Sequence, residues 1–317
     1  MRKLILGAEG FIGTNLVLKL FKDESNSIVL YDKPEKEYIN LGEMRYSDRI
    51  EIKEGIFNLK EDFDLLTSGV SEVYHLISTT IPSNSNEKIA QGIEDNVVVT
   101  AKLLDACVRN KVSKVIFISS GGTVYGVERK MPIPENAALN PISAYGMQKI
   151  SIEKLLYLYR YMYGLDYRII RLANPYGPYQ KPNGIQGVIA TFIYQALAEM
   201  PLKVYGDGTI VRDYIYIDDA INSILNIVNY SGEEKTFNLG TEIGYSLNEI
   251  IDIIGKVTGK KLHVQYMPGR KIDVPINILD MNKYKSLFGE MEFKSIQSGI
   301  RETVSYIYKY ICQMDAK

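Results

Sequence analysis

Three glycines near the start of the chain, Gly7, Gly10 and Gly13, restrict its fold more than any other feature. An apolar run over residues 3–6 precedes them and an amphipathic segment over residues 14–21 follows, which predicts a strand, a tight turn and a helix. Glycines at this spacing permit a sharp turn, a close approach of the backbone to a pyrophosphate, and close packing of the helix against the strand. The helix N-terminus then offers N–H groups to the phosphates. The pattern predicts a dinucleotide-binding βαβ unit, against the alternative of an ordinary βαβ unit with a glycine-rich turn.

A carboxylate at the end of the second apolar run refines this prediction. Residues 28–31 are apolar and lead directly into Asp32, which lies nineteen residues after Gly13. An acidic side chain at this place would bind the 2′-hydroxyl of the adenosine ribose and would repel a 2′-phosphate. The sequence therefore favours NAD over NADP as the dinucleotide.

Strands and helices alternate up to residue 172. This pattern predicts an α/β fold, a Rossmann-type doubly wound parallel sheet with ligands at the carboxyl ends of its strands. Prolines and glycines then break the alternation, so we expect an NAD-binding domain over 1–172 and a smaller C-terminal α/β substrate-binding lobe over 173–317, with segments near 210–242 as candidates to rejoin the first domain. The expected strands cover residues 3–6, 28–31, 50–52, 73–77, 115–118 and 165–172, and the expected helices cover residues 93–108, 143–163 and 188–200.

The composition excludes several classes of protein. The net charge is −1, so the chain lacks the excess of positive charge that is typical of nucleic-acid-binding proteins. No apolar run approaches the ~20 residues of a membrane span, and the first strand follows Met1 too closely for a signal peptide. Two cysteines and two histidines make no metal-binding pattern, so we expect no metal site and a cytoplasmic location.

One tyrosine carries a chemical signature. Among 24 tyrosines, only Tyr145 is followed by a lysine at the fourth position, Lys149. On a helix this spacing places the two side chains on one face. A nearby ammonium favours the phenolate and should lower the tyrosine pKa from its usual ~10, which would make Tyr145 a base for a sugar hydroxyl. The alternative is a surface tyrosine beside a solvated lysine.

These motifs together resemble the extended short-chain dehydrogenases/reductases of the NAD-dependent epimerase/dehydratase family. The glycine turn, Asp32, the serine-rich strand end before Val124-Tyr125-Gly126, and the Tyr145–Lys149 pair carry the resemblance. Within that family the chain is similar to nucleotide-sugar 4-epimerases of the UDP-galactose 4-epimerase type, over nearly its whole length.

The resemblance implies roles for individual residues. Tyr145 and Lys149 match the catalytic pair, and Arg212 and Arg270 match two arginines that clamp the diphosphate of a UDP-sugar, against the alternative of surface ion pairs with nearby aspartates. A homodimer through helices near 95–110 and 145–162 is also implied. The implied NAD contacts are Gly7, Gly10, Phe11, Ile12, Gly13, Asp32, Leu76, Ile77, Asn96, Ser119, Tyr145 and Lys149. The implied substrate contacts are Asn174, Arg212, Arg270, Asp273 and Asn277.

The chain departs from the family pattern at several positions. Gly121 stands where a Ser or Thr is usual, so we expect Thr123 to supply the assisting hydroxyl, with Ser120 as the alternative. Ile56 replaces the usual adenine-binding aspartate, which leaves a looser adenine site or one that uses Asn58. The acids that related dehydratases and decarboxylases carry near Gly122 and Thr123 are missing, which argues against both reactions.

The resulting hypothesis is NAD-dependent 4-epimerisation of a UDP-hexose or UDP-N-acetylhexosamine. Tyr145 would take the 4-hydroxyl proton while NAD accepts hydride from C4, and hydride would return to the other face of a transient 4-keto sugar. Asn277 is modest in size and would admit a 2-N-acetyl group. The alternatives are an NAD(P)-dependent 4-keto-sugar reductase and a non-catalytic NAD-sensing protein.

Overall fold

The computed structural model describes residues 1–182, 187–270 and 272–315. It divides into two compact units. The first unit comprises residues 1–124, 141–171 and 224–237, and the second comprises residues 125–140, 172–223 and 238–317. The chain therefore passes between the units more often than a single boundary at residue 172 would require.

The elements of the first unit alternate as the sequence pattern predicts. Its strands are β1 (Arg2–Leu6), β2 (Ser27–Asp32), β3 (Ile50–Glu54), β4 (Glu72–His75) and β5 (Lys114–Ser120), joined by β6 (Asp166–Leu172) and β10 (Thr236–Leu239) at the boundary between the units. Its helices are α1 (Phe11–Leu20), α2 (Phe63–Thr67), α3 (Ile89–Ile93), α4 (Val99–Arg109) and α5 (Ala144–Tyr163), with a 3-10 helix (Ile39–Tyr46), a π-helical turn (Glu94–Val98) and the end of α7 (Ile217–Asn229).

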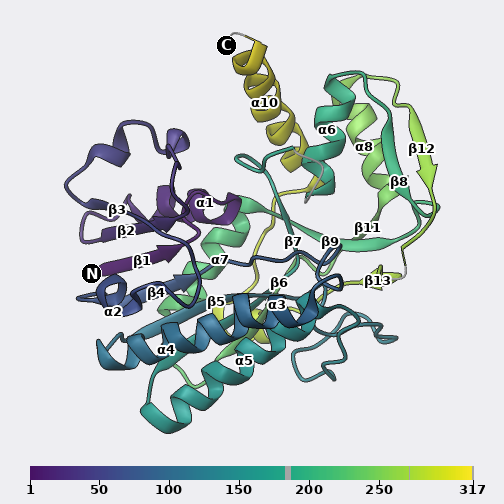
Figure 1. Ribbon diagram of the computed structural model, residues 1–317. Coiled ribbons are helices and arrows are strands. Elements are labelled where there is room, and N and C mark those ends of the chain that lie inside the picture. The colour runs from purple at the N-terminus through teal and green to yellow at the C-terminus, as the bar shows by residue number, and fades with distance from the viewer. Residues whose placement is uncertain (183–186, 271, 316–317) are drawn as a thin grey trace. The chain divides into compact units, whose positions relative to one another are not determined.

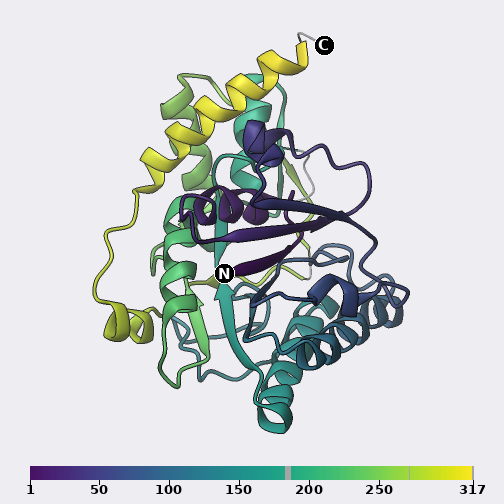
Figure 2. The ribbon, with the colours of Figure 1, turned by 90° about the vertical axis from the view of Figure 1, so that its left-hand side faces the viewer.

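The seven strands form one sheet in the order β10-β6-β5-β4-β1-β2-β3. The central strands pair in parallel, with Leu6 beside both Tyr31 and His75. The strand order reverses between β1 and β4, and this reversal is where a doubly wound sheet binds its ligand. Helices α4 and α5 lie side by side on one side of β1, and α1 lies on the other (Figures 1 and 2). The predicted Rossmann-type fold is confirmed.

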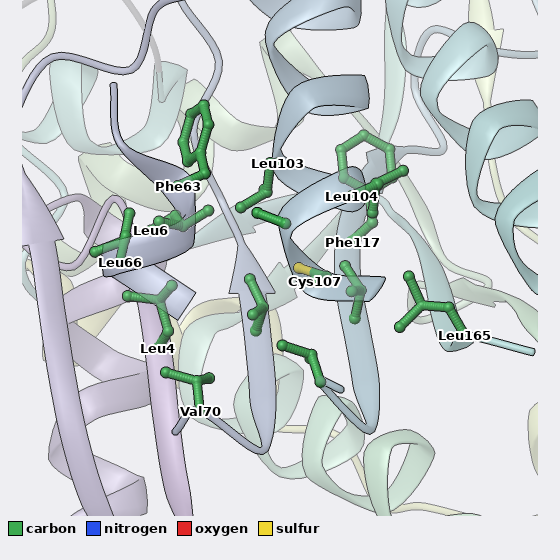
Figure 3. Close-up of a cluster of buried hydrophobic side chains, with 14 of the residues drawn as sticks. Leu4, Leu6, Phe63, Leu66, Val70, Leu103, Leu104, Cys107, Phe117 and Leu165 are labelled. Carbon is green, nitrogen blue, oxygen red and sulfur yellow. The ribbon is translucent and has the colours of Figure 1, made fainter. Parts of the chain in front are cut away.

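A hydrophobic core fixes α2, α4 and α5 against the sheet. Side chains of α2 and α4 project toward those of β1 and β5, with Leu103 and Phe117 fully buried (Figure 3). Burying such a side chain contributes roughly 1.5–3 kcal/mol. This core holds strands β1 and β5 and the second half of α5 in place.

The helix expected over residues 93–108 differs from the structure. It begins at Ile89, and the π-helical turn at Glu94–Val98 separates α3 from α4. The turn places Asn96 on the buried side, where its side chain bonds to neighbouring segments. Such turns occur frequently at functional sites.

Among its described residues, the second unit combines short strands with four complete helices and the first part of α7. Its sheet has the order β11-β9-β13, with β7 also pairing with β9, and β8 pairs separately with β12. The strands are β7 (Asn174–Tyr176), β8 (Leu202–Tyr205), β9 (Val211–Tyr216), β11 (Gly244–Ser246), β12 (Val264–Met267) and β13 (Ile276–Asn277). The helices are α6 (Val188–Leu197), α8 (Leu247–Thr258), α9 (Asn282–Phe288) and α10 (Ile296–Asp315), together with the first part of α7. Within the described ranges, no helix is long and apolar enough to cross a bilayer.

Candidate active site

The glycine turn between β1 and α1 has the geometry of a phosphate cradle. Gly7 has a φ of +87°, and its N–H donates to the Tyr31 carbonyl at 2.8 Å. A Cβ on Gly13 would collide with the Gly7 carbonyl oxygen and would lie 2.8 Å from the Ala8 oxygen. Helix α1 starts after Gly10, which has no side chain to cap the first-turn N–H groups. The cradle therefore fits the pyrophosphate of a dinucleotide, because backbone approaches closely and these donors point outward.

Asp32 lies at the end of β2, beside the glycine turn. Its Oδ2 accepts the Glu9 N–H at 3.0 Å, and its Oδ1 accepts the Lys33 N–H at 2.9 Å. Lys36 pairs with Glu9 at 3.2 Å. Asp32 thus holds the middle of the turn and also places a carboxylate where the adenosine ribose is expected.

We expect Asp32→Asn to reduce the preference for NAD over NADP by about tenfold or more. The amide lacks the charge that repels a 2′-phosphate, and a difference of about 1.4 kcal/mol is a factor of ten. Because the amide oxygen can still accept the Glu9 N–H, the turn should be preserved. Dissociation constants for both dinucleotides measure the effect, with the exposed Asp48→Asn as control. An unchanged ratio of the two constants would remove Asp32 from the ribose site.

The segment after β4 lies beside the glycine turn. Leu76 donates its N–H to the Leu6 carbonyl at 3.1 Å, and the Ile77 side chain lies against Gly7. Asn96 accepts the Thr79 N–H at 2.9 Å and donates to the Thr79 hydroxyl at 2.8 Å. Leu76, Ile77 and Asn96 are therefore gathered on the first unit close to the expected dinucleotide path.

Part of the segment expected to bind adenine, residues 56–58, already makes hydrogen bonds to neighbouring residues. Ile56 is 57% exposed, and the side-chain oxygen of Asn58 accepts the Lys60 N–H at 2.8 Å. The Asn58 amide group remains the candidate adenine contact, and this assignment stays a prediction.

Tyr145 and Lys149 lie on one face of α5, as their spacing predicts. The Lys149 ammonium lies 5.4 Å from the centre of the Tyr145 ring and 4.7 Å from that of Phe117. It donates to the Ile118 carbonyl at 2.9 Å. Burial raises the pKa of Tyr145 to about 12 and lowers the pKa of Lys149 to about 8. The expected lowering of the tyrosine pKa is therefore absent in this structure, because desolvation dominates and the ammonium faces the ring and a carbonyl.

Thr123 lies next to the start of α5. Gly146 packs on it so closely that a Cβ there would lie 2.7 Å from the Thr123 carbonyl oxygen. The Thr123 hydroxyl is buried and has no hydrogen-bond partner among the described residues. Ser120 accepts the N–H groups of Thr123 and Val124 through its own carbonyl at 3.2 Å. A buried unpaired hydroxyl is costly, so Thr123 stays the candidate for the assisting hydroxyl.

Ser119 is engaged inside the protein. Its hydroxyl donates to Glu153 Oε1 at 2.5 Å, and Glu153 is held by Arg171. The sequence reasoning had missed both of these partners. Glu153 lies four residues after Lys149, so a search for helical spacings could have found it, whereas nothing local points to Arg171. The expected contact of Ser119 with NAD stays a prediction.

The second unit gathers most of the expected substrate residues around β9. Arg212 lies directly opposite Asn277 in the β9–β13 pair, and its Nη1 donates to the Val274 carbonyl at 2.7 Å. Asp273 lies 3.9 Å from Arg212, and Asn174 donates to the Asp213 carbonyl at 2.9 Å. Burial lowers the pKa of Arg212. A carboxylate at 3.9 Å and two neutral backbone carbonyls leave this guanidinium suited to an anionic group.

The carbonyl of Arg270 accepts the Asp273 N–H at 3.2 Å, which joins Arg270 to this cluster through the backbone. Its guanidinium lies over the Tyr205 ring, 3.4 Å from the ring centre, where β8 and β12 end. Stacking on an aromatic face leaves the edge donors of a guanidinium free for a phosphate. Tyr205 was not among the predicted residues, since nothing in the local sequence links it to Arg270.

Comparison with known proteins covers nearly the whole chain. A sequence model of the NAD dependent epimerase/dehydratase family matches residues 3–240. A UDP-glucose 4-epimerase of Mycolicibacterium smegmatis is 33% identical over 96% of this chain and 98% of its own length. A dTDP-4-dehydro-6-deoxyglucose reductase of Escherichia coli is 28% identical over 96% of each chain. The crystal structure of a UDP-glucose 4-epimerase from Thermotoga maritima, with UDP-glucose, has a TM-score of 0.90 and 32% identity, and covers 98% of this chain and 100% of that one.

Proposed function

Because this chain belongs to the NAD-dependent epimerase/dehydratase family, we propose that it interconverts the C4 epimers of a UDP-hexose or a UDP-N-acetylhexosamine. The observation that carries the proposal is the arrangement at the start of α5. Tyr145 shares a helix face with Lys149, and Thr123, whose hydroxyl has no hydrogen-bond partner among the described residues, packs against the neighbouring Gly146. Both sequence relatives and solved structures named as UDP-glucose 4-epimerases support it.

NAD fits the first unit, because Gly13 packs closely against the Gly7 carbonyl and the start of α1 has no side-chain cap on its N–H groups. When bound, it supplies a reversible hydride acceptor for the sugar carbon. The backbone at Gly7, Gly10, Phe11, Ile12 and Gly13 would hold the pyrophosphate, and Asp32 would hold the adenosine ribose. Leu76, Ile77, Asn96, Ser119, Tyr145 and Lys149 would line the remainder.

Tyr145 would hold and return the proton of the sugar 4-hydroxyl. Since burial raises its pKa to about 12, the phenol is protonated at neutral pH and needs assistance before it can act as a base. Lys149 provides a cation beside the ring, and Thr123 provides a hydroxyl that can relay the proton. Tyr145 would then return the proton as the acid when the sugar carbon is reduced again.

The second unit would bind the UDP-sugar. Arg212 and Arg270 offer guanidinium groups to the diphosphate, and Asp273 and Asn174 lie near the first of these arginines. Asn277 is fully buried directly opposite Arg212 and would limit the 2-substituent of the hexose. Its modest volume supports acceptance of an N-acetyl group. Turnover of UDP-glucose without any turnover of UDP-N-acetylglucosamine would refute this part of the proposal.

A second candidate is reduction of a 4-keto sugar nucleotide. The 28% identity to the Escherichia coli reductase over nearly the whole chain favours keeping it. A reductase consumes reduced cofactor in proportion to product, whereas an epimerase does not. The missing acids at Gly122 and Thr123 argue against dehydration and decarboxylation.

The test is to incubate the purified protein with separate UDP-hexoses and UDP-N-acetylhexosamines without added cofactor. Formation of 4-epimers to equilibrium is the expected result. Conversion of 4-keto sugars with stoichiometric loss of NADH or NADPH, and no epimer from any sugar, would favour the reductase instead.

We expect Thr123→Val to lower kcat about tenfold to a hundredfold while leaving stability unchanged or slightly raised. The substitution keeps the shape and removes a hydroxyl that makes no internal hydrogen bond among the described residues. Rates and thermal melting of this variant should be compared with those of Ser120→Ala, which we expect to have the smaller effect. A larger loss of rate in Ser120→Ala would transfer the role to Ser120.

We also propose that the protein is a homodimer through α4 and α5. The outer face of α5 exposes several aromatic side chains, with Tyr157 62% and Tyr161 79% exposed. An interface there would bury this apolar area. A light-scattering mass equal to that of one chain would contradict the proposal.

A further inference from the structure

Three buried polar side chains join β5, α5 and β6 behind the catalytic face. Ser119, Glu153 and Arg171 are each at most 5% exposed. The Ser119 hydroxyl donates to Glu153 Oε1 at 2.5 Å. Arg171 donates to the same carboxylate from Nη2 at 2.7 Å and from Nε at 3.1 Å. The Glu153 carboxylate is therefore held in one orientation by donors from both strands.

This carboxylate lies close to Lys149. Glu153 follows Lys149 by one turn of α5, and Lys149 donates to the carbonyl of Ile118, the residue directly before Ser119. Glu153 and Lys149 both extend from α5, and each is hydrogen-bonded to β5, Glu153 at Ser119 and Lys149 at Ile118. Helical neighbours at this spacing interact electrostatically.

Lys149 needs a compensating charge because it is only 5% exposed. Burial lowers the pKa of Lys149 to about 8, and the Glu153 carboxylate acts in the opposite direction. The other titratable groups that interact with Lys149 are Tyr145 on α5 and His75 on β4, while Arg171 on β6 binds the Glu153 carboxylate. Burial lowers the pKa of His75 to about 3, so this imidazole is neutral at physiological pH. Glu153 is therefore the negative charge that acts on Lys149 from the described part of the first unit.

We propose that Glu153 is a positioning residue that keeps Lys149 in its charged form, and that Arg171 limits the strength of this effect. The inference rests on the proposed role of Lys149 beside Tyr145. A buried ion pair by itself contributes little net stability. The function of the Glu153–Arg171 pair is therefore inferred from its location beside Lys149. Ser119 contributes by fixing the carboxylate on the side of β5.

The test is a direct titration of Lys149 by NMR, in protein labelled with ¹³C at the lysine ε-carbon and saturated with NAD. The signal is assigned by its absence in Lys149→Arg. We expect Glu153→Gln to lower the midpoint by roughly half a pH unit or more, since it removes the favourable charge. Arg171→Gln should raise the midpoint by a smaller amount, since it removes an opposing charge. A purely structural role would not produce shifts of opposite sign.

The matched control is the other buried ion pair of the first unit, between Lys3 and Glu72. Glu72→Gln removes a buried, paired carboxylate of the same kind at the beginning of β4, and should leave the Lys149 midpoint unchanged. If Glu153→Gln fails to fold, the apolar double variant Glu153→Leu/Arg171→Met replaces it, because removing both partners of a buried pair is tolerated better than removing one. In this double variant the midpoint of the Lys149 titration should lie below that of wild type, but by less than in Glu153→Gln.

An unchanged midpoint in Glu153→Gln, or in the double variant where the single one does not fold, would overturn the inference, as would an equal shift in Glu72→Gln. The alkaline limb of the kcat profile should move with the midpoint. Shifts of the expected sign in a protein that epimerises no UDP-sugar would disprove the proposed function and leave this inference intact.

Discussion

Replacing Tyr145 with phenylalanine is expected to lower kcat at least about a thousandfold. The phenolic oxygen is the group proposed to hold the proton of the sugar 4-hydroxyl, and positioned acid–base groups contribute about 10²- to 10⁴-fold. The fold should persist, because phenylalanine keeps the aromatic ring. The Lys149 ammonium, which lies 5.4 Å from the centre of this ring, therefore keeps its contact. NAD binding should also persist, since the glycine turn and Asp32 lie on other elements. Initial rates with each UDP-sugar that the wild type converts, together with the content of bound NAD, measure both effects.

Tyr308→Phe is the matched control for this variant. Tyr308 also lies on a helix, α10, but is 60% exposed and outside the proposed dimer face, so its substitution should leave kcat, melting temperature and NAD content unchanged. A kcat within tenfold of wild type in Tyr145→Phe would show that another group moves the proton. Loss of folding in Tyr145→Phe alone would mean that the phenol has a structural role.

The second large effect is expected from Gly13→Ala, which should abolish measurable NAD binding and lower the melting temperature. The added Cβ would collide with the Gly7 carbonyl oxygen and lie 2.8 Å from the Ala8 oxygen. These atoms belong to the backbone of the turn, so they can move only if the turn opens. A Gly-to-Ala change inside a helix ordinarily stabilises a protein by about 0.5–1 kcal/mol. A loss of stability in Gly13→Ala would therefore be the opposite of what helix propensity predicts.

Gly255→Ala provides the matched control in a helix without such a contact. Gly255 lies in α8, and its added Cβ would lie 3.6 Å from the Lys260 carbonyl oxygen, an ordinary packing distance. This variant should be neutral or slightly more stable than wild type and should retain NAD. Wild-type NAD affinity in Gly13→Ala would mean that the glycine turn does not form the dinucleotide site.

Local sequence patterns predicted the first unit well. Apolar runs and the glycine spacing indicated strands β1 to β6 and the turn before α1, because burial against a shared core imposes those patterns directly. The spacing of Tyr145 and Lys149 correctly placed both side chains on one face of α5. It did not indicate the protonation behaviour of the pair, since desolvation depends on the surrounding segments.

Features that depend on distant segments were missed. Asn96, in the π-helical turn, donates to Thr79 and to Gln148, and no helical periodicity reveals these contacts. Arg171 reaches Glu153 only because β6 lies beside β5 in the sheet. Residues 125–140 also join the second unit, where Asn238 donates to the Ile133 carbonyl at 2.8 Å across a long stretch of sequence.

Long-range pairing also determines which residues form the first unit, and residues 224–237 lie inside the segment near 210–242 that the sequence indicates as a candidate to rejoin it. β10 adds to the edge of the seven-stranded sheet, so residues 224–237 return to the first unit. The Arg168 side chain binds the carbonyls of Ile227 and Tyr230 near the end of α7, which holds this returning segment. Contacts of this kind depend on the order of the strands in the sheet, so the local sequence does not predict them.

The most direct test of the account follows the hydrogen at C4 of the sugar. A UDP-sugar that the protein converts should be supplied with deuterium at C4, and its 4-epimer should be analysed by NMR. We predict that the product keeps deuterium at C4 almost completely, because the same hydrogen leaves that carbon and returns to it within one bound state. Replacement of the deuterium by solvent hydrogen, or its accumulation on free cofactor with a 4-keto product, would contradict epimerisation by transient oxidation.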